Sequence, residues 1–172
     1  MINLYDIELA KKITGEQDPE ILKFYLDSLI NKIEGILGYT LALSDRTEII
    51  RGINKTHIYV KTRPLKSVLE CTFYGANITD SISIVDNKKI DLGFQLCSNE
   101  NINLKYTAGF EEFPKSIQMF LFSQVMGITN KLDFQGIESY KIKDISYSFT
   151  PDLDKEKAFE NEVKNLFGAI WI

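Results

Sequence analysis

The middle of the chain, residues 47–110, limits the possible folds more than any other feature, because its apolar residues recur with a period of two. Alternation is clearest in 81–84 and 102–106, and the whole region is rich in β-branched and aromatic residues. Both properties are typical of half-buried strands. Turn signals separate the segments, among them residues 75–77 and 86–88. We expect four to six short strands in a small antiparallel sheet, including 56–61, 67–74, 81–85 and 102–106.

Helical periodicity lies on both sides of this region. Asp18 and Pro19 are a helix start signal, apolar residues at spacings of three and four follow, and Gly38 stands where a helix often ends. A shorter helix is expected near 7–13, so the first helical part covers about 7–38. A central helix is predicted over 114–131, then a strand over 140–149 and a last helix over 151–170.

These elements predict an α+β fold in one domain, 1–172. The expected architecture is a small bundle of three or four helices, with the antiparallel β-rich region inserted between the first long helix and the central helix. The central helix carries Ile117, Phe120 and Leu121 on one stripe and Met119 and Phe122 on its flank. A helix that is apolar this far around is expected to be buried on more than one side, within the fold or against a second subunit.

The charge balance argues against a sequence-specific nucleic-acid binder. The chain has 172 residues, with 20 basic and 24 acidic ones and a formal charge of −4. Only three of the basic residues are arginine, the residue that supplies most bidentate contacts to phosphate and guanine. The longest apolar run has four residues, far short of a membrane span, and no signal peptide is visible, so a soluble, cytoplasmic-type chain is expected.

No set of residues predicts catalysis, a metal site or a bound cofactor. The single histidine, His57, lies at a solvent-facing position of an alternating strand. Cys71 and Cys97 are expected to be free, partly buried thiols, with Cys71 in the core, and two Cys with one His cannot complete a zinc site without carboxylates. The acidic residues of 152–162 fit the solvated face of a helix.

Five positive charges stand in a stretch, 49–69, that has no acidic residue. This basic strip consists of Arg51, Lys55, Lys61, Arg63 and Lys66. Such a strip is typical of a solvated strand face, but it also fits a subunit contact, a DNA tunnel or a nucleic-acid contact.

The last residues, 165–172, are strongly apolar. We expect Leu166, Phe167, Ile170, Trp171 and Ile172 either to complete the core or to dock on a partner. The partner is favoured, because Gly168 is expected to interrupt the helix just before these anchor residues.

Four patches, in this order, carry a resemblance to a known family: IEGILGY at 33–39, VKTRPLKSV at 60–68, LKYTAGF at 104–110 before Pro114, and GIESYKIKDISYSF at 136–149. With these patches, the segment 18–151 resembles the head–tail connector (adaptor) family of tailed bacteriophages and prophages. Many relatives carry Gly at the position of Lys143, so the local turn there is expected to differ.

The resemblance implies a non-enzymatic structural protein of the virion neck, assembled in the bacterial host cytoplasm. Relatives form a dodecameric ring below the portal protein, extend the DNA tunnel and give tail-side proteins a docking surface. They engage the portal through their C-terminal segments. Two other readings remain open from the residues alone: a ligand- or nucleic-acid-binding module using the basic β-rich middle, and a small enzyme whose site forms only in the fold.

Overall fold

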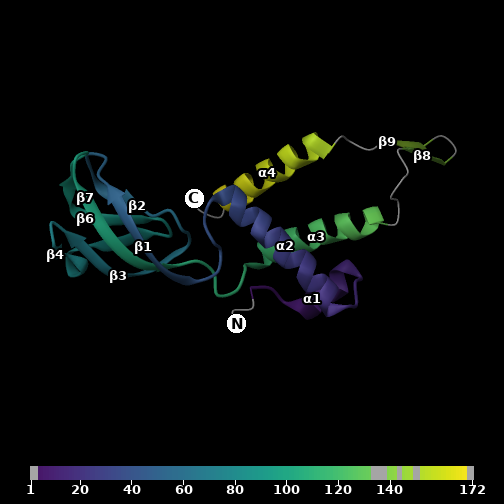
Figure 1. Cartoon of the computed structure of the whole chain (residues 1–172), viewed down its shortest axis with the longest axis horizontal. Helices are drawn as coiled ribbons and strands as arrows, with labels where there is room; N and C mark the ends of the chain where they lie inside the picture. The colour runs from purple at the N-terminus through teal and green to yellow at the C-terminus, as the bar shows by residue number, and fades with distance from the viewer. Residues whose placement is uncertain (1–3, 133–138, 143–144, 149–151, 170–172) are drawn as a thin grey trace. The chain divides into compact units, whose positions relative to one another are not determined.

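The chain folds into two compact units of different secondary structure. The computed structural model describes residues 4–132, 139–142, 145–148 and 152–169. Gly38–Glu112 form a β unit, and Tyr5–Leu37 combine with the segment that begins at Phe113 into a helical unit. The β unit is inserted between two helices of the helical unit, so the predicted α+β class and the inserted β-rich region are confirmed (Figure 1).

The β unit contains two antiparallel sheets. Its strands are β1 (Ser44–Arg51), β2 (Lys55–Tyr59), β3 (Leu65–Phe73), β4 (Ala76–Asn77), β5 (Ser83–Asp86), β6 (Lys89–Leu96) and β7 (Asn101–Ala108). One sheet has the order β1-β7-β3-β4 and the other the order β2-β6-β5. The expectation of one sheet with four to six strands is therefore wrong. β1 was missed because its polar and charged residues hide the alternation, and β6 because Gly93 and Asp91 weaken the local strand signal.

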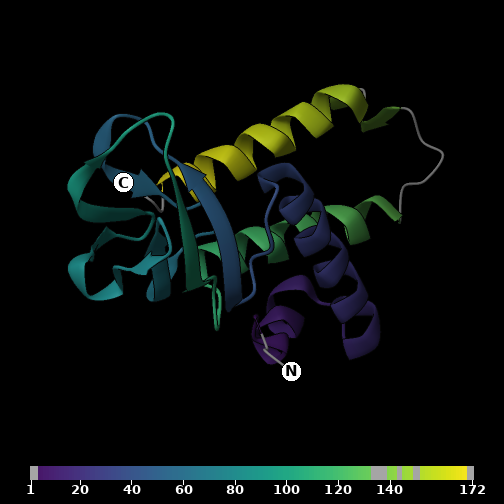
Figure 2. The ribbon, with the colours of Figure 1, turned by 60° about the vertical axis from the view of Figure 1, so that its left-hand side comes forward.

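Both sheets contribute to one hydrophobic core, and Figure 2 shows the strands that carry its residues. β7 follows the period of two most clearly, since Ile102, Leu104 and Tyr106 are buried while their neighbours are half-buried or exposed. The other sheet contributes Ile58 from β2 and Ile90 from β6. Burial of apolar residues from two facing sheets accounts for how a unit of short strands holds together.

The helical unit contains α1 (Ile7–Thr14), α2 (Pro19–Leu37), α3 (Lys115–Leu132) and α4 (Asp152–Ala169). The predicted boundaries of α2 are confirmed: Asp18 Oδ1 accepts a hydrogen bond from the Glu20 amide, and Gly38 adopts a left-handed conformation with φ 73°. Gly168 lies within α4, so the expected helix interruption there is wrong. One poor helix former is not enough to end a helix that tertiary packing supports.

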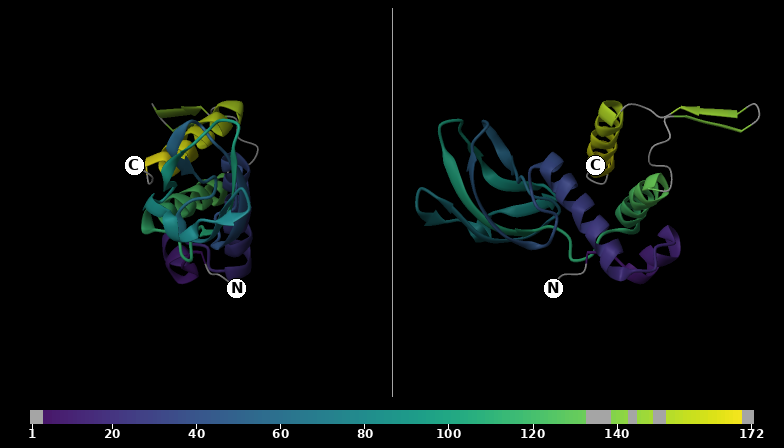
Figure 3. Two further views of the ribbon diagram at one scale, coloured as in Figure 1. Left: turned by 90° about the vertical axis from the view of Figure 1, so that its left-hand side faces the viewer. Right: turned by 45° about the vertical axis from the view of Figure 1, so that its right-hand side comes forward.

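The helices of the unit, drawn in Figure 3, each contribute buried apolar residues. The fully buried residues include Leu22, Leu26 and Ile33 of α2, Ile117, Leu121, Phe122 and Val125 of α3, and Val163 of α4. The Lys32 ammonium lies 5.0 Å from the centre of the Phe159 ring and 3.5 Å from a Glu156 oxygen, which connects α2 to α4. In the part of the chain that the structure describes, no helix is long and apolar enough to cross a membrane.

A separate hairpin replaces the single strand expected over 140–149. β8 (Ser139–Ile142) and β9 (Ile145–Ser148) form an antiparallel two-stranded sheet, with Tyr140 opposite Tyr147. Residues 143–144, including Lys143, lie outside the described residues. The alternation of this segment fits one long strand and two short ones equally well, because each strand keeps the period of two.

Candidate functional site

The single histidine lies on a strand face, as the alternation predicts. His57 is half-buried on β2, and its ring stands edge-on to that of Tyr59 at 5.3 Å. Ile58 and Val60 face the core. The strand register places Asp91 of β6 opposite His57, so the histidine has the environment of a packed surface residue of the sheet.

The two cysteines are free thiols in different environments. Cys71 is fully buried in β3, as expected, and burial raises the pKa of its thiol to about 11. It is therefore protonated at neutral pH and a poor nucleophile. Cys97 is exposed, which corrects the expectation of a partly buried thiol, and the nearby Glu100 charge raises its pKa. Among the described residues no cluster of three or more His, Cys, Asp or Glu could hold a metal ion.

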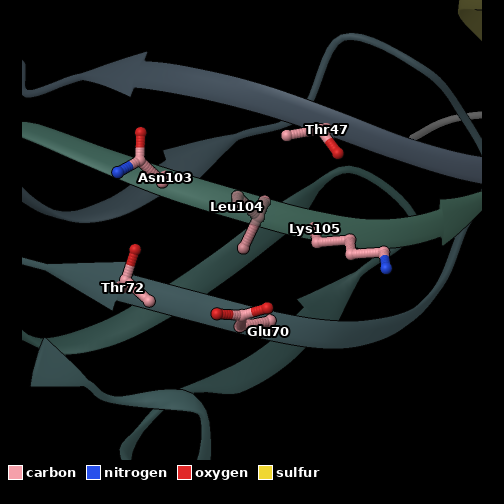
Figure 4. A pocket seen from close by; sticks show the side chains of 6 residues that line it. All are labelled: Thr47, Glu70, Thr72, Asn103, Leu104 and Lys105. Carbon is pink, nitrogen blue, oxygen red and sulfur yellow. The ribbon is translucent and has the colours of Figure 1, made fainter. Parts of the chain in front are cut away.

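A shallow pocket of about 300 Å³ lies on the outer face of the four-stranded sheet (Figure 4). Its lining residues are Thr47 of β1, Glu70 and Thr72 of β3, and Asn103, Leu104 and Lys105 of β7. The strand register places Thr47 and Glu70 on either side of Lys105. All of its lining residues except Leu104 are polar or charged residue types. The polar half of the β7 alternation marks this surface in the sequence.

The structure divides the basic strip into two groups at opposite ends of β2. Arg51 ends β1 and Lys55 begins β2, and Arg51 Nε donates a hydrogen bond to the Ser98 carbonyl at 2.7 Å. Lys61 and Arg63 follow the other end of β2, and Lys66 lies at the start of β3. The five residues therefore do not form one continuous row along a strand face.

Arg46, which is not part of the predicted basic strip, lies at the same end of the β unit as Lys61, Arg63 and Lys66. Its Nη2 donates a hydrogen bond to Thr40 Oγ1. Arg63 acts on the adjacent Tyr39, where burial raises the pKa of the phenol and the Arg63 charge opposes the rise. Lys61 Nζ lies 3.9 Å from the position that a Cβ on Gly38 would take. Arg46 is not part of the predicted strip because Glu48 stands between it and the acid-free stretch.

The carboxylate of Glu48, on the same strand as Arg46, already accepts two hydrogen bonds. Glu48 Oε2 accepts hydrogen bonds from the Tyr106 hydroxyl at 2.9 Å and from the Lys61 amide at 3.3 Å. Burial first, and then the Glu48 hydrogen bond, raises the pKa of Tyr106. The Tyr106 hydroxyl in turn accepts a hydrogen bond from the Thr62 amide at 3.4 Å. These bonds tie β1 and β7 to the segment that follows β2.

Of the expected C-terminal anchor residues, the structure describes only the first two. Leu166 is half-buried and Phe167 is buried, while Ile170, Trp171 and Ile172 lie outside the described residues. Phe167 is therefore not available as an exposed anchor in this structure.

Several large apolar side chains are exposed on both units. On the helices, Phe24 of α2 is 70% exposed and Met119 of α3 is 49% exposed, and on the outer face of the four-stranded sheet Ile49 is 69% exposed. On the flank of the central helix Met119 is thus exposed, whereas Phe122 is buried within the fold. Exposed apolar residues of this size are typical of protein–protein contact surfaces when they gather on one face.

No protein-family model matches the chain, and no curated protein matches it either. Solved structures do resemble it. A chain of "Neck of empty GTA particle computed with C6 symmetry" has a TM-score of 0.51 and 14% identity, covering 72% of this chain and 76% of the other. A chain of "Virion of native gene transfer agent (GTA) particle" has a TM-score of 0.50 and 13% identity, covering 84% and 82%.

A third chain, from "Neck of native GTA particle computed with C12 symmetry", has a TM-score of 0.50 and 14% identity, covering 78% of this chain and 81% of the other. At these identities the comparisons establish the fold. The protein shares its α+β fold with chains of the necks and virions of phage-like gene transfer agent particles.

Proposed function

We propose that this protein is a non-enzymatic structural component of the neck of a phage-like particle. In this role it is a head–tail connector (adaptor) that forms a ring below the portal, extends the DNA tunnel and docks tail or head-closure proteins. The observation that carries the proposal is the fold shared with chains of particle necks over most of both chains. One of those necks was computed with C12 symmetry, which suits a dodecameric ring.

The exposed apolar residues support a role in assembly. In a closed ring each copy meets its neighbours through two different surfaces, so a ring subunit needs more than one contact patch. Exposed apolar residues occur on α2, α3 and the sheet face, at Phe24, Met119 and Ile49. Burying an aliphatic or aromatic side chain contributes about 1.5–3 kcal/mol, and repetition around a ring multiplies the effect.

We assign the portal contact to the apolar C-terminal segment that contains Leu166, Phe167, Ile170, Trp171 and Ile172. Because Phe167 is buried, we assign the docking contact to the residues that follow it, together with the half-buried Leu166. The few arginines and the net charge of −4 suit a tunnel through which DNA slides, since each phosphate contact strengthens binding to DNA.

The test is assembly with the portal protein of the same particle. The purified chain, alone and mixed with the portal, is measured by mass photometry and imaged by cryo-electron microscopy. We expect a ring of copies on the tail-side end of the portal. A chain that remains monomeric at high concentration and does not bind the portal contradicts the proposal. If that monomer binds double-stranded DNA at low salt, the nucleic-acid-binding alternative takes its place.

A further inference from the structure

Three cationic side chains around residues 38–40 form a cluster that makes no ion pair with the described residues of the chain. This arginine cluster consists of Arg46, Lys61 and Arg63, which lie next to Thr40, Gly38 and Tyr39 respectively. The Nε atoms of Arg46 and Arg63 are both buried, and neither has a hydrogen-bond partner. They are the buried side-chain atoms left without a partner in the part of the chain that the structure describes.

Such unpaired donors are unusual in a folded protein. Buried polar groups are almost always hydrogen-bonded, and a buried charged donor without an acceptor is strongly unfavourable. The third arginine shows the ordinary case, because Arg51 Nε donates to the Ser98 carbonyl. Two of the three arginines thus leave a donor unused, both at the same end of the β unit.

The acidic groups nearby do not supply the missing acceptor. Glu48 Oε2 already accepts from the Tyr106 hydroxyl and the Lys61 amide. Asp45, on the same strand as Arg46, accepts from the Thr107 hydroxyl at 2.8 Å. The two Nε donors are therefore open to an acceptor from outside the β unit.

A carboxylate matches these donors better than a DNA phosphate does. The Nε and Nη groups of arginine form a fork that binds planar carboxylates through two parallel hydrogen bonds. A DNA backbone needs cations spread along an exposed surface, whereas these two Nε atoms are buried. A single acidic side chain can reach such a site more readily than a row of phosphates can.

We propose that the arginine cluster receives an acidic side chain from a second copy of this chain, as a charged contact between neighbours. The inference rests on the proposed function, since a ring supplies the second copy. The charges of the chain are complementary in the required way. Residues 38–112 contain nine basic and nine acidic residues, so the remainder of the chain carries the whole formal charge of −4. In a head-to-tail ring, that acidic remainder of one copy faces a different surface of the next.

The test compares two variants that lose the same charge. R46Q/R63Q removes both unpaired donors, and R51Q/K55Q removes two positive charges at the opposite end of β2 as the matched control. Self-association, alone or on the portal, is measured by mass photometry from about 50 to about 500 mM salt. We expect association of R46Q/R63Q to be at least about tenfold weaker at low salt. The control should change by less than about fivefold.

Thermal unfolding separates an intermolecular role from a structural one. The two Nε donors have no partner among the described residues, and R46Q removes only the Arg46 Nη2–Thr40 hydrogen bond, so the melting temperature of R46Q/R63Q should fall by no more than about 4 °C. A large decrease in melting temperature would overturn the inference, as would association equal to that of the control. Loss of DNA binding without loss of association would assign the site to phosphate instead.

The outcomes distinguish this inference from the proposed function. If the wild type assembles and R46Q/R63Q assembles equally well at every salt concentration, the inference is wrong and the function stands. If the wild type forms no assembly and does not bind the portal, the proposed function fails and this inference fails with it. A third variant, R46K/R63K, keeps the charge without the fork and should associate with intermediate strength.

Discussion

The environment of single residues explains why two identical thiols behave differently in this protein. Cys71 is fully buried in β3, and its amide donates to Thr79 Oγ1 at 2.8 Å. Cys97 is exposed in the segment after β6, where Glu100 Oε2 accepts its amide at 2.7 Å. Burial controls the first thiol, whereas a neighbouring charge controls the second.

We expect one thiol per folded chain to react with a thiol reagent at pH 8. The thiolate is the reactive form, and a pKa of about 11 leaves only about one Cys71 in a thousand ionised at that pH. Cys71 should react only after unfolding, and C97S should abolish the reaction of the folded chain. Two thiols that react at equal rates in the folded chain would contradict the buried position of Cys71.

The same assay tests the Glu100 charge. Glu100→Gln removes the carboxylate that disfavours the thiolate, so the pKa of Cys97 should fall and its reaction at pH 8 should accelerate. Glu70→Gln, which neutralises an exposed carboxylate in the sheet pocket, is the matched control and should leave the rate unchanged. Equal rates for the two variants would show that Glu100 does not control this thiol.

At the scale of elements, the two sheets meet where the segment between β1 and β2 crosses the end of β6. The Gly52 amide donates to the Glu100 carbonyl at 2.9 Å, and the Asn54 amide donates to the Leu96 carbonyl at 2.9 Å. A Cβ on Gly52 would lie 2.0 Å from the Cys97 carbonyl oxygen, which is backbone and cannot move freely. Only glycine permits this close approach.

Gly52→Ala should therefore destabilise the protein, whereas an equivalent change in a helix should not. We expect a loss of about 1–3 kcal/mol or more in the free energy of unfolding by urea. Gly35→Ala is the control: Gly35 lies in α2 with open space around its Cβ position, and alanine there should stabilise by about 0.5–1 kcal/mol. Similar effects of the two substitutions would show that the close approach does not constrain the fold.

At the scale of the whole molecule, the proposed function requires each chain to keep its fold while its free surfaces bind other proteins. Both units have their own buried residues, and exposed apolar side chains remain on each. The residues proposed to contact the portal follow Phe167, whose ring is buried. We therefore expect truncation after Phe167 to separate portal binding from folding.

Deleting residues 168–172 should abolish portal binding and leave the fold intact. The truncation retains Phe167 and the buried residues of α4 before it, so the melting temperature should change by less than about 4 °C. Binding to the portal, measured by mass photometry, should be lost because the apolar docking residues are removed. A melting temperature lower by more than about 8 °C would place the deleted residues in the core and contradict the anchor. Trp171→Ala provides a milder variant with the same expected direction.

Local patterns in the sequence predicted the elements whose signals lie within a few neighbouring residues. Asp18 and Pro19 marked the start of α2, Gly38 marked its end, and the alternation of 102–106 marked the buried face of β7. The burial of Cys71 and the surface position of His57 followed from the same local patterns. Capping, turn chemistry and periodicity act between residues close in the chain, so a sequence read alone contains them.

Only the tertiary structure decided the features that depend on strands distant in sequence. β1 is a strand because it pairs with β7, which begins about fifty residues later, and that register places Arg46 opposite Tyr106. The same pairing brings Glu48 to the Tyr106 hydroxyl and gathers Arg46 with Lys61 and Arg63, while Arg51 lies at the far end of the strand. The fold thus separates residues that are neighbours in the basic strip and brings Arg46 near Lys61 and Arg63. The reason is that strand pairing sets the distances between side chains, and these distances cannot be derived from spacing along the chain.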